Sequence, residues 1–145
     1  MSNNLVRDWM TSNLVTVSQN SPIRDAYWLM VDNKIRRLPV VDHGHLVGII
    51  TMEDLRRTEP PTGIGLDLVK ITAILSKMIV RQVMTKDPLT ISSDLSLIDA
   101  AQMMLENKIS ALPVIENDQL VGIITESDIF QAFVKLETEK YAQTS

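Results

Sequence analysis

The 145-residue sequence contains no cysteine, and this absence removes two kinds of stabilising site. No disulfide framework can form, and no zinc site with thiolate ligands can be built. The sequence is also short of positive charge, with a formal net charge of −4 and no long basic run. Nonspecific binding of nucleic acid requires many Lys and Arg side chains that neutralise phosphates. Nucleic acid is therefore not an expected partner.

Long hydrophobic segments are missing as well. No apolar run approaches the roughly 20 residues that a membrane helix requires. The N-terminal segment Met1-Ser2-Asn3-Asn4 lacks the basic and apolar regions of a signal peptide. We therefore expect a cytoplasmic protein with no membrane partner.

Signatures of catalysis are absent too. The sequence shows no Ser-His-Asp set, no cluster of metal-ligand residues and no phosphate-binding glycine loop. His43 and His45 flank Gly44 beside Asp42, but a metal site would need further ligands, so exposed turn histidines are the simpler interpretation. We expect no enzyme, with no catalytic residues, no metal site and no required cofactor.

What the sequence does contain is a repeat at a fixed offset of 74 residues. Met10-Thr11 returns as Met84-Thr85, with no insertion or deletion between the copies. Other segments that return are Asn33-Lys34-Ile35 as Asn107-Lys108-Ile109, Leu38-Pro39-Val40 as Leu112-Pro113-Val114, and residues 46–51 as 120–125. Such regularity predicts two copies of one supersecondary unit. Two copies can pack about a pseudo-twofold axis and leave two related clefts between them.

The repeat predicts how the chain is divided. We expect a first repeat at residues 5–58, a linker at 59–78, a second repeat at 79–134 and a polar C-terminal tail at 135–145. Hydrophobic residues make up 45% of the sequence, enough to bury a core. Each copy has only about 50 structured residues, which is marginal for an independent domain, so the two copies are expected to share one core.

Each copy is predicted to form a strand, a helix, two strands and a second helix, which makes the fold class α/β. Short β-branched runs at Leu14–Val17 and at residues 88–91 predict the first strands. Ser21-Pro22 predicts a helix with Ser21 as its N-cap, and Ser96 with Asp99 resembles a capping box. The apolar residues predicted to share a buried helix face are Ile23, Ala26, Leu29 and Met30 in the first copy, and Leu97, Ala100, Met103 and Met104 in the second.

The rest of each copy is predicted to be a hairpin and a second helix. Polar links at residues 42–45 and 116–119 predict the hairpin turns. The second helices are expected to start near Thr51 and Thr125. In the second copy an apolar stripe is formed by Ile129, Phe130, Phe133 and Val134. Leu66 to Met78 is predicted to be a linker helix, and the residues from about Lys135 are expected to fray.

The segments Gly48–Asp54 and Gly122–Asp128 are the most informative, because both have the pattern Gly-x-x-Thr-x-x-Asp. A glycine inside a strand often permits close approach of another backbone or a ligand. The Thr-x-x-Asp that follows lies at a strand-to-helix junction, where it can form a capping box. The same geometry suits a ligand, because the Thr hydroxyl can hold a phosphate and the carboxylate can accept two ribose hydroxyls. The local sequence leaves both interpretations open.

These motifs resemble the CBS domain. The resemblance rests on Met-Thr, a short strand, Ile-x-x-Leu-Pro-Val, and Leu-Val-Gly-Ile-Ile-Thr-x-x-Asp, complete in both copies from about Leu5 to Phe133. Two in tandem resemble a CBS pair, or Bateman module, with intertwined β-α-β-β-α repeats. Lys34 to Pro39 and the Leu68–Val83 linker resemble the CBS pair of AcuB-like acetoin-utilisation proteins. Those proteins often carry a C-terminal ACT-like domain, and we expect none here because the 145 residues end too soon after the second repeat.

The resemblance implies two ligand clefts for adenosyl compounds such as AMP, ADP, ATP or S-adenosylmethionine. Cleft A would be formed by Thr125, Asp128, Thr11, Thr16, Arg36, Arg37 and Leu38. Cleft B would be formed by Thr51, Asp54, Thr85, Thr90, Ser110, Ala111 and Leu112. In each cleft the resemblance implies that the Asp takes the ribose hydroxyls and that backbone before the Pro reads the adenine edge.

The two predicted clefts differ in charge. Arg36-Arg37 of the first copy is replaced by Ser110-Ala111 in the second. Two guanidinium groups suit a phosphate chain, because Arg can bind phosphate oxygens in a bidentate manner. A solvated surface Arg pair is the alternative. The cleft with Ser110-Ala111 would suit ligands with little phosphate, or would stay empty.

The resemblance implies a non-enzymatic regulatory module that senses an adenosyl ligand, as in energy sensing. It also implies a homodimer formed through the helices. A ligand that binds one arrangement of the repeats better than another would shift the population, and the output is expected to reach an effector protein in trans. The alternative is a structural dimerisation or protein-interaction module with vacant clefts.

Overall fold

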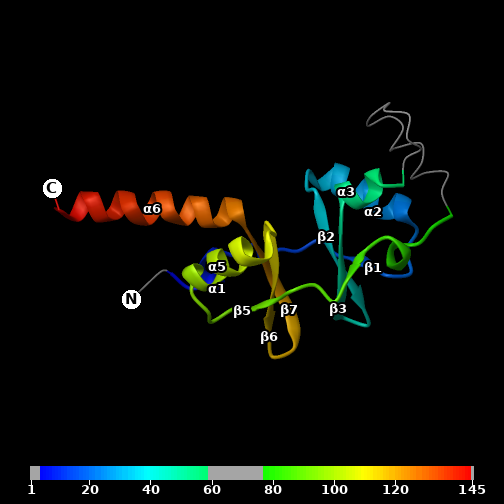
Figure 1. The fold of residues 1–145 in the computed structure, drawn as a ribbon, viewed down its shortest axis with the longest axis horizontal. Coiled ribbons are helices and arrows are strands. Elements are labelled where there is room, and N and C mark those ends of the chain that lie inside the picture. Colours follow the sequence, from blue (N-terminus) through cyan, green and yellow to red (C-terminus); the bar gives the residue numbers. More distant parts are fainter. Residues whose placement is uncertain (1–3, 59–76, 145) are drawn as a thin grey trace. The chain divides into compact units, whose positions relative to one another are not determined.

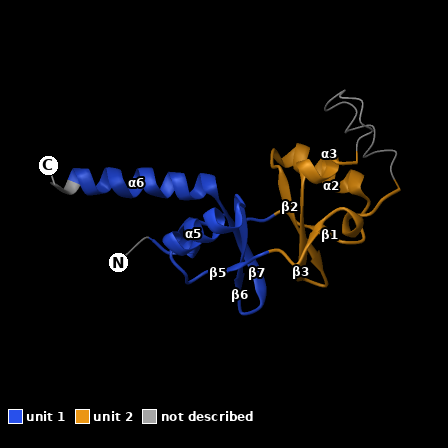
Figure 2. Cartoon of the chain, in the orientation of Figure 1, with its two compact units in different colours: residues 1–14, 89–145 blue, residues 15–88 orange. Residues whose placement is uncertain are grey.

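The structure is a computed structural model that describes residues 4–58 and 77–144. The chain forms two compact units: unit 1 contains residues 1–14 and 89–145, and unit 2 contains residues 15–88 (Figure 2). The division does not follow the sequence repeats, because the first residues of each repeat fold with the other repeat. The predicted linker helix falls, over residues 66–76, outside the described residues.

Unit 2 is built around a four-stranded sheet with the order β1-β2-β3-β4 (Figure 1). Strand β1 is parallel to β2, whereas β2, β3 and β4 pair antiparallel. Its elements in chain order are β1 (Val17–Ser18), α2 (Ile23–Asn33), β2 (Arg37–Asp42), β3 (His45–Thr51), α3 (Met52–Arg56), the 3-10 helix η1 (Val80–Gln82) and β4 (Thr85–Lys86). The β-α-β-β-α order predicted for the first repeat is thus confirmed, and β4 is added from the second.

Unit 1 repeats the plan around a three-stranded sheet with the order β5-β6-β7. Its elements are α1 (Val6–Trp9), β5 (Ile91–Ser92), α5 (Leu97–Asn107), β6 (Ala111–Glu116), β7 (Gln119–Thr125) and α6 (Glu126–Thr144). An isolated bridge joins Thr11 to Ile123, so the N-terminal segment lies along β7 where β4 lies along β3. The α/β class and the two repeats are confirmed.

The strand glycines permit this edge pairing. Gly48 of β3 faces the Met84-Thr85 segment, and a Cβ there would lie 2.5 Å from Met84 Sδ and 2.8 Å from the Thr85 carbonyl oxygen. Gly122 of β7 is placed in the same way against Met10-Thr11, at 2.6 Å from Met10 Sδ and 2.9 Å from the Thr11 carbonyl oxygen. The close approach predicted for these glycines is therefore an approach of backbone and methionine.

Both predicted hairpins are present, each with a two-residue turn. His43 and Gly44 have φ angles of 51° and 82°, and Asn117 and Asp118 have φ angles of 52° and 62°. Positive φ at both turn positions matches the twist of the flanking strands. Glycine, Asn and Asp tolerate this conformation well, whereas His43 adopts it less readily.

The start of each long helix is capped differently. The Ser96–Asp99 capping box is confirmed, with the Asp99 amide donating to Ser96 Oγ at 3.0 Å. The Ser21 N-cap prediction is wrong by one residue, because α2 begins at Ile23 after Pro22 and has no side-chain cap. The Ile23 amide instead donates to the Met78 carbonyl at 3.1 Å. A residue directly before the second repeat therefore satisfies a helix end in the first.

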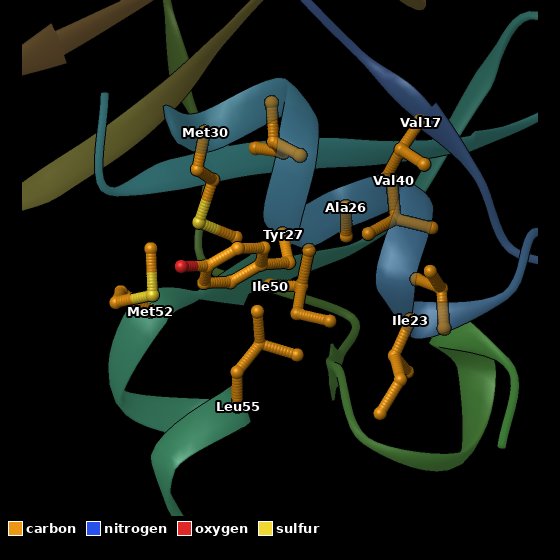
Figure 3. Close-up of a cluster of buried hydrophobic side chains, with 11 residues drawn as sticks. Val17, Ile23, Ala26, Tyr27, Met30, Val40, Ile50, Met52 and Leu55 are labelled. Carbon is orange, nitrogen blue, oxygen red and sulfur yellow. The ribbon is translucent and has the colours of Figure 1, made fainter. Parts of the chain in front are cut away.

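Among the described residues, buried side chains form two clusters, one in each unit, and each cluster contains residues of both repeats. The cluster of unit 2 lies between α2, β2, β3 and α3 (Figure 3) and contains fully buried Ile23, Met30, Leu38 and Ile50. The cluster of unit 1 includes Val6, Leu112, Val114 and Ile124, each with no exposed surface. Of the predicted helix faces, Leu29 and Met103 are only partly buried, and Tyr27 is buried in addition.

Three predicted boundaries need correction. The strand expected at residues 88–91 begins only at Ile91, which pairs with Val114. The strand expected at Leu14–Val17 begins only at Val17, because the parallel pairing covers just Val17 with Val40 and Ser18 with Val41. The C-terminal residues do not fray, since α6 continues to Thr144. The core of unit 1 extends under this helix to Leu136, which packs against it. The polar composition of residues 135–145 hid this contact.

We predict that Gly48→Ala lowers the free energy of unfolding by about 1–3 kcal/mol, because the new methyl group would overlap Met84 and the Thr85 backbone. Urea denaturation measures the change. His45→Ala, at an exposed position of the same strand, is the control and should change stability by less than about 0.5 kcal/mol. An unchanged midpoint for Gly48→Ala would mean that the Met84-Thr85 segment does not lie against β3.

Candidate functional site

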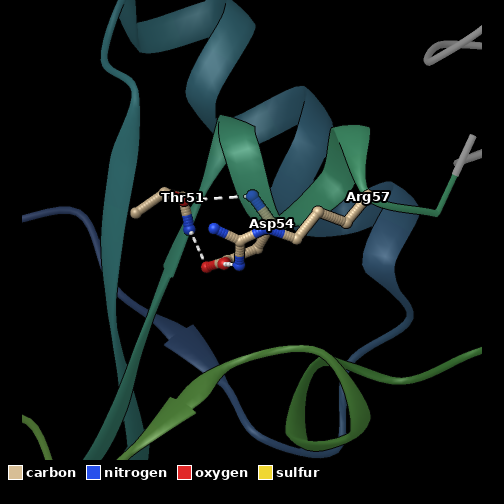
Figure 4. Close-up of polar contacts among 3 residues, drawn as sticks. All are labelled: Thr51, Asp54 and Arg57. Carbon is tan, nitrogen blue, oxygen red and sulfur yellow. Dashed lines mark hydrogen bonds and ion pairs between the residues drawn. The ribbon is translucent and has the colours of Figure 1, made fainter.

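The first Thr-x-x-Asp motif forms the junction between β3 and α3 (Figure 4). The Thr51 amide donates to Asp54 Oδ2 at 2.8 Å, and the Asp54 amide donates to Thr51 Oγ1 at 3.1 Å. The Arg57 guanidinium pairs with the other carboxylate oxygen, with Nη1 2.9 Å from Asp54 Oδ1. The Asp54 side chain is only 6% exposed. The capping box is therefore formed, and both carboxylate oxygens have partners.

The second motif forms the equivalent junction between β7 and α6. Asp128 Oδ2 accepts hydrogen bonds from the Thr125 amide at 2.9 Å and from Thr125 Oγ1 at 3.1 Å. The Asp128 amide lies 3.3 Å from Thr125 Oγ1. Asp128 is partly exposed, whereas Asp54 is buried. Both junctions thus combine a cap with a fixed carboxylate, as the two interpretations of the motif allow.

The residues before each proline lie beside the junction of their own unit. Arg37 pairs with Thr51 across the β2–β3 ladder, and the Met52 amide donates to the Arg36 carbonyl at 2.9 Å. In unit 1, Ala111 pairs with Thr125 and the Glu126 amide donates to the Ser110 carbonyl at 3.0 Å.

Leucine side chains at the next positions are not available to a ligand. Leu38 and Leu112 have no exposed surface and belong to the two cores. Only their backbone could contact a bound molecule, which agrees with the role that the family resemblance implies for this segment.

The predicted threonines of the edge segments are placed by backbone pairing. Thr85 pairs with Ile49 at the edge of unit 2, and Thr11 exchanges two hydrogen bonds of 2.9 Å with Ile123 in unit 1. Both threonines are exposed, while Thr16 and Thr90 are partly buried. Each unit therefore carries one Thr-x-x-Asp junction, one pre-proline segment and one edge threonine.

The structure distributes the two predicted residue sets over both units. Thr51, Asp54 and Thr85 of cleft B lie in unit 2, and so do Thr16 and Arg36 to Leu38 of cleft A. Thr11, Thr125 and Asp128 of cleft A lie in unit 1, and so do Thr90 and Ser110 to Leu112 of cleft B. What the sequence analysis missed is Arg57, although its spacing of three residues from Asp54 is typical of a helical ion pair.

The acidic residues of α3 form ion pairs with nearby arginines. Glu53 lies 3.8 Å from Arg36 and 3.9 Å from Arg56, while Asp54 pairs with Arg57. The Arg36 side chain is 66% exposed and the Glu53 side chain 65% exposed, so their contact is screened by water. The surface Arg pair considered from the sequence is thus partly neutralised by Glu53.

The turn histidine lies beside a single carboxylate. His43 Nδ1 lies 3.0 Å from Asp42 Oδ1, with the histidine 91% exposed. Among the residues that the structure describes, no group of three or more His, Asp or Glu could hold a metal ion. Within the same residues, no helix is long and apolar enough to cross a membrane.

The motifs and the paired edge segments are those of a known family. The family model of the CBS domain matches residues 6–60 and 80–135. The chain therefore belongs to the CBS domain family and contains a tandem pair. It spans about half the length of curated relatives such as protein MJ1225 of Methanocaldococcus jannaschii, which is 33% identical over 140 residues and matches across 90% of this chain and 48% of its own.

Solved structures of other CBS pairs share the fold. CBSX2 from Arabidopsis thaliana, crystallised in complex with AMP, is 30% identical with a TM-score of 0.79 and covers 92% of this chain and 99% of its own. The CBS pair of protein MJ0100 in complex with 5-methylthioadenosine and S-adenosyl-L-methionine is 29% identical, with a TM-score of 0.72 and coverage of 90% and 96%.

The resemblance to AcuB is also found in a structure. AcuB from Vibrio cholerae is 29% identical with a TM-score of 0.75, and the match covers 95% of this chain and 96% of that one. The tandem CBS pair that resembles AcuB is therefore confirmed. Two of these solved CBS pairs thus contain adenosyl ligands, AMP in CBSX2 and 5-methylthioadenosine with S-adenosyl-L-methionine in the MJ0100 pair.

We predict that Thr51→Ala lowers the stability of the ligand-free protein by about 1 kcal/mol, because the Asp54 amide loses its cap. Thr51→Ser retains a hydroxyl oxygen and is the matched control, expected to lose less than half as much. Urea denaturation without added nucleotide measures both variants. Equal stability of Thr51→Ala and wild type would show that the threonine does not act as a cap.

Proposed function

We propose that this protein is a non-enzymatic regulatory module that binds an adenosyl ligand through a Thr-x-x-Asp junction. The observation that carries the proposal is the fixed carboxylate of Asp128, which is held by Thr125 through one oxygen and is partly exposed. The AMP complex of CBSX2 and the S-adenosylmethionine complex of the MJ0100 pair support the choice of ligand class.

The chemistry of the junction suits a nucleoside. A ribose offers two neighbouring hydroxyl groups that can donate to a carboxylate, and hydrogen bonds to a charged acceptor are stronger than neutral ones. The Thr125 hydroxyl at the same junction can turn toward a phosphate oxygen. Arg36 and Arg37, the charged positions that the second repeat lacks, are assigned to the phosphate, so AMP, ADP or ATP would bind better than adenosine.

Signalling would follow from population shift. A ligand that binds one arrangement of the protein better than another stabilises that arrangement by its difference in affinity. No catalytic group is needed for this response. We propose that the protein acts in the cytoplasm, senses the level of an adenine nucleotide or of S-adenosylmethionine, and passes the change to an effector protein in trans.

A homodimer is the second part of the proposal, supported by apolar surface on two helices of unit 1. On α6 the Phe130, Phe133 and Val134 side chains are 66%, 64% and 63% exposed. On α5 the Ile98 and Leu105 side chains are 74% and 79% exposed. Contiguous exposed apolar side chains are typical of protein interfaces. A structural dimerisation or interaction module with vacant clefts is the alternative function that this surface also supports.

We predict that AMP raises the melting temperature of the purified, ligand-free protein, because a ligand that binds the folded state stabilises it by mass action. Asp128→Ala should weaken binding roughly tenfold to a hundredfold, the loss expected for a charged hydrogen bond of ~1.5–3 kcal/mol. A thermal-shift assay measures the melting temperature, and isothermal titration calorimetry measures the affinity. Asp118→Ala, which removes a carboxylate in the β6–β7 turn, is the control and should bind like wild type.

Arg36→Ala combined with Arg37→Ala should weaken AMP more than adenosine, because the guanidinium groups are assigned to phosphate. Equal weakening of both ligands would overturn the charge assignment. If no adenosyl compound, S-adenosylmethionine included, bound at millimolar concentration, the ligand proposal would fail and the alternative with vacant clefts would remain.

We predict a homodimer at micromolar protein concentration by multi-angle light scattering. Phe130→Ser with Phe133→Ser should weaken the dimer roughly tenfold or more, because aromatic side chains contribute strongly to interfaces. Leu89→Ser, which removes an exposed leucine outside the two helices, is the control and should leave the dimer unchanged. A monomer at the highest soluble concentration of the wild type would contradict the prediction.

A further inference from the structure

The two Thr-x-x-Asp junctions differ in the residue three positions after the Asp, which in the first junction contacts the carboxylate. Three positions after Asp54 the chain has Arg57, and three positions after Asp128 it has Gln131. The Arg57 guanidinium lies 2.9 Å from Asp54 Oδ1. Gln131 is exposed and makes no hydrogen bond to Asp128 in the described part of the chain. The repeat thus provides its own natural comparison at this position.

The difference changes what each carboxylate can still accept. Asp54 uses Oδ2 for the Thr51 amide and Oδ1 for Arg57, and its side chain is 6% exposed. Asp128 uses only Oδ2, for the amide and hydroxyl of Thr125; within the described residues its Oδ1 has no hydrogen bond or ion pair. At Asp54 both carboxylate oxygens are therefore occupied by the protein, whereas at Asp128 the Oδ1 atom is available to a ligand.

The neighbouring charges favour this pairing of Arg57. Glu53, the nearest other carboxylate on α3, already lies 3.8 Å from Arg36 and 3.9 Å from Arg56. The second repeat has Ser127 and Phe130 at the positions of Glu53 and Arg56. The junction of the first repeat is thus surrounded by charged side chains that pair with one another. Of the corresponding positions in the second repeat, only Asp128 is charged.

A ribose would have to compete with this ion pair at Asp54. A guanidinium and a sugar hydroxyl both make charge-assisted hydrogen bonds to a carboxylate, but only the guanidinium also brings an opposite charge. Exchanging Arg57 for an uncharged hydroxyl group at Oδ1 would therefore give up an ion pair of a carboxylate that is only 6% exposed. At Asp128 Oδ1 the sugar hydroxyl groups would displace no side chain among the described residues.

From this comparison, and resting on the proposed function, we infer that Arg57 blocks Asp54 as a ribose acceptor. The chain then has one open adenosyl site, at Asp128, and Gln131 is the residue that leaves it open. Arg57 is a residue that sets the number of sites, and the two repeats differ in function although their folds match.

The test exchanges the two residues in the full-length, ligand-free protein and counts AMP sites per chain by isothermal titration calorimetry. Wild type should bind one AMP, Arg57→Gln should bind two, and Gln131→Arg should bind at least tenfold more weakly than wild type. Adding Asp54→Ala to Arg57→Gln should return the count to one. Arg56→Gln, which removes the neighbouring arginine, is the matched control and should keep the count at one.

Several outcomes would overturn the inference. Two sites in the wild type, each lost on mutation of one Asp, would show that the ion pair does not block Asp54, while the proposed function would stand. Weaker binding by Arg57→Gln would show that Arg57 contacts the ligand. If neither AMP nor S-adenosylmethionine bound to wild type or to Arg57→Gln, the proposed function itself would fail. Urea denaturation of each variant verifies that it is folded, and Arg57→Lys offers a second variant that keeps the charge but not the bidentate group.

Discussion

The close approach of a Met-Thr segment to a strand glycine is the constraint on which the rest of the structure depends. At Gly48 and at Gly122 a side chain of even one carbon would meet backbone. Because these two glycines have no side chain, the segment that begins one repeat can lie along the last strand of the other. Each sheet then gains an edge neighbour, and the strand ends at a junction where Thr and Asp are held by hydrogen bonds. The geometry of both candidate sites follows from this packing.

Much of the fold could be predicted from the sequence because the repeat shows the same pattern twice. The hairpins, the Ser96 cap and the strand-to-helix junctions depend on turn residues and hydrogen bonds between residues that are close in the sequence. The predictions failed where a distant segment decides the outcome. Ile23 begins its helix against the Met78 carbonyl, and α6 continues because Leu136 meets the core of unit 1. Neither contact can be recognised from the residues that surround it in the sequence.

The candidate site shows the same limit. The sequence identifies Thr51, Asp54, Thr125 and Asp128, because their spacing is that of a capping box. It does not show whether the carboxylates remain available, since that depends on the guanidinium of Arg57 reaching Asp54. Capping and ligand binding are compatible roles, because a cap uses one oxygen of a carboxylate and leaves the other. The difference between the junctions lies in that second oxygen.

The division into units also affects the order in which the chain can fold during synthesis. Unit 2 is contiguous, from residue 15 to residue 88, so all of its strands exist once the first ten residues of the second repeat have been translated. Unit 1 draws on both ends of the chain, and the segment around Thr11 has no partner until Ile123 has left the ribosome. Since domains generally fold as units from the N-terminal side, the first residues made are among the last to be placed.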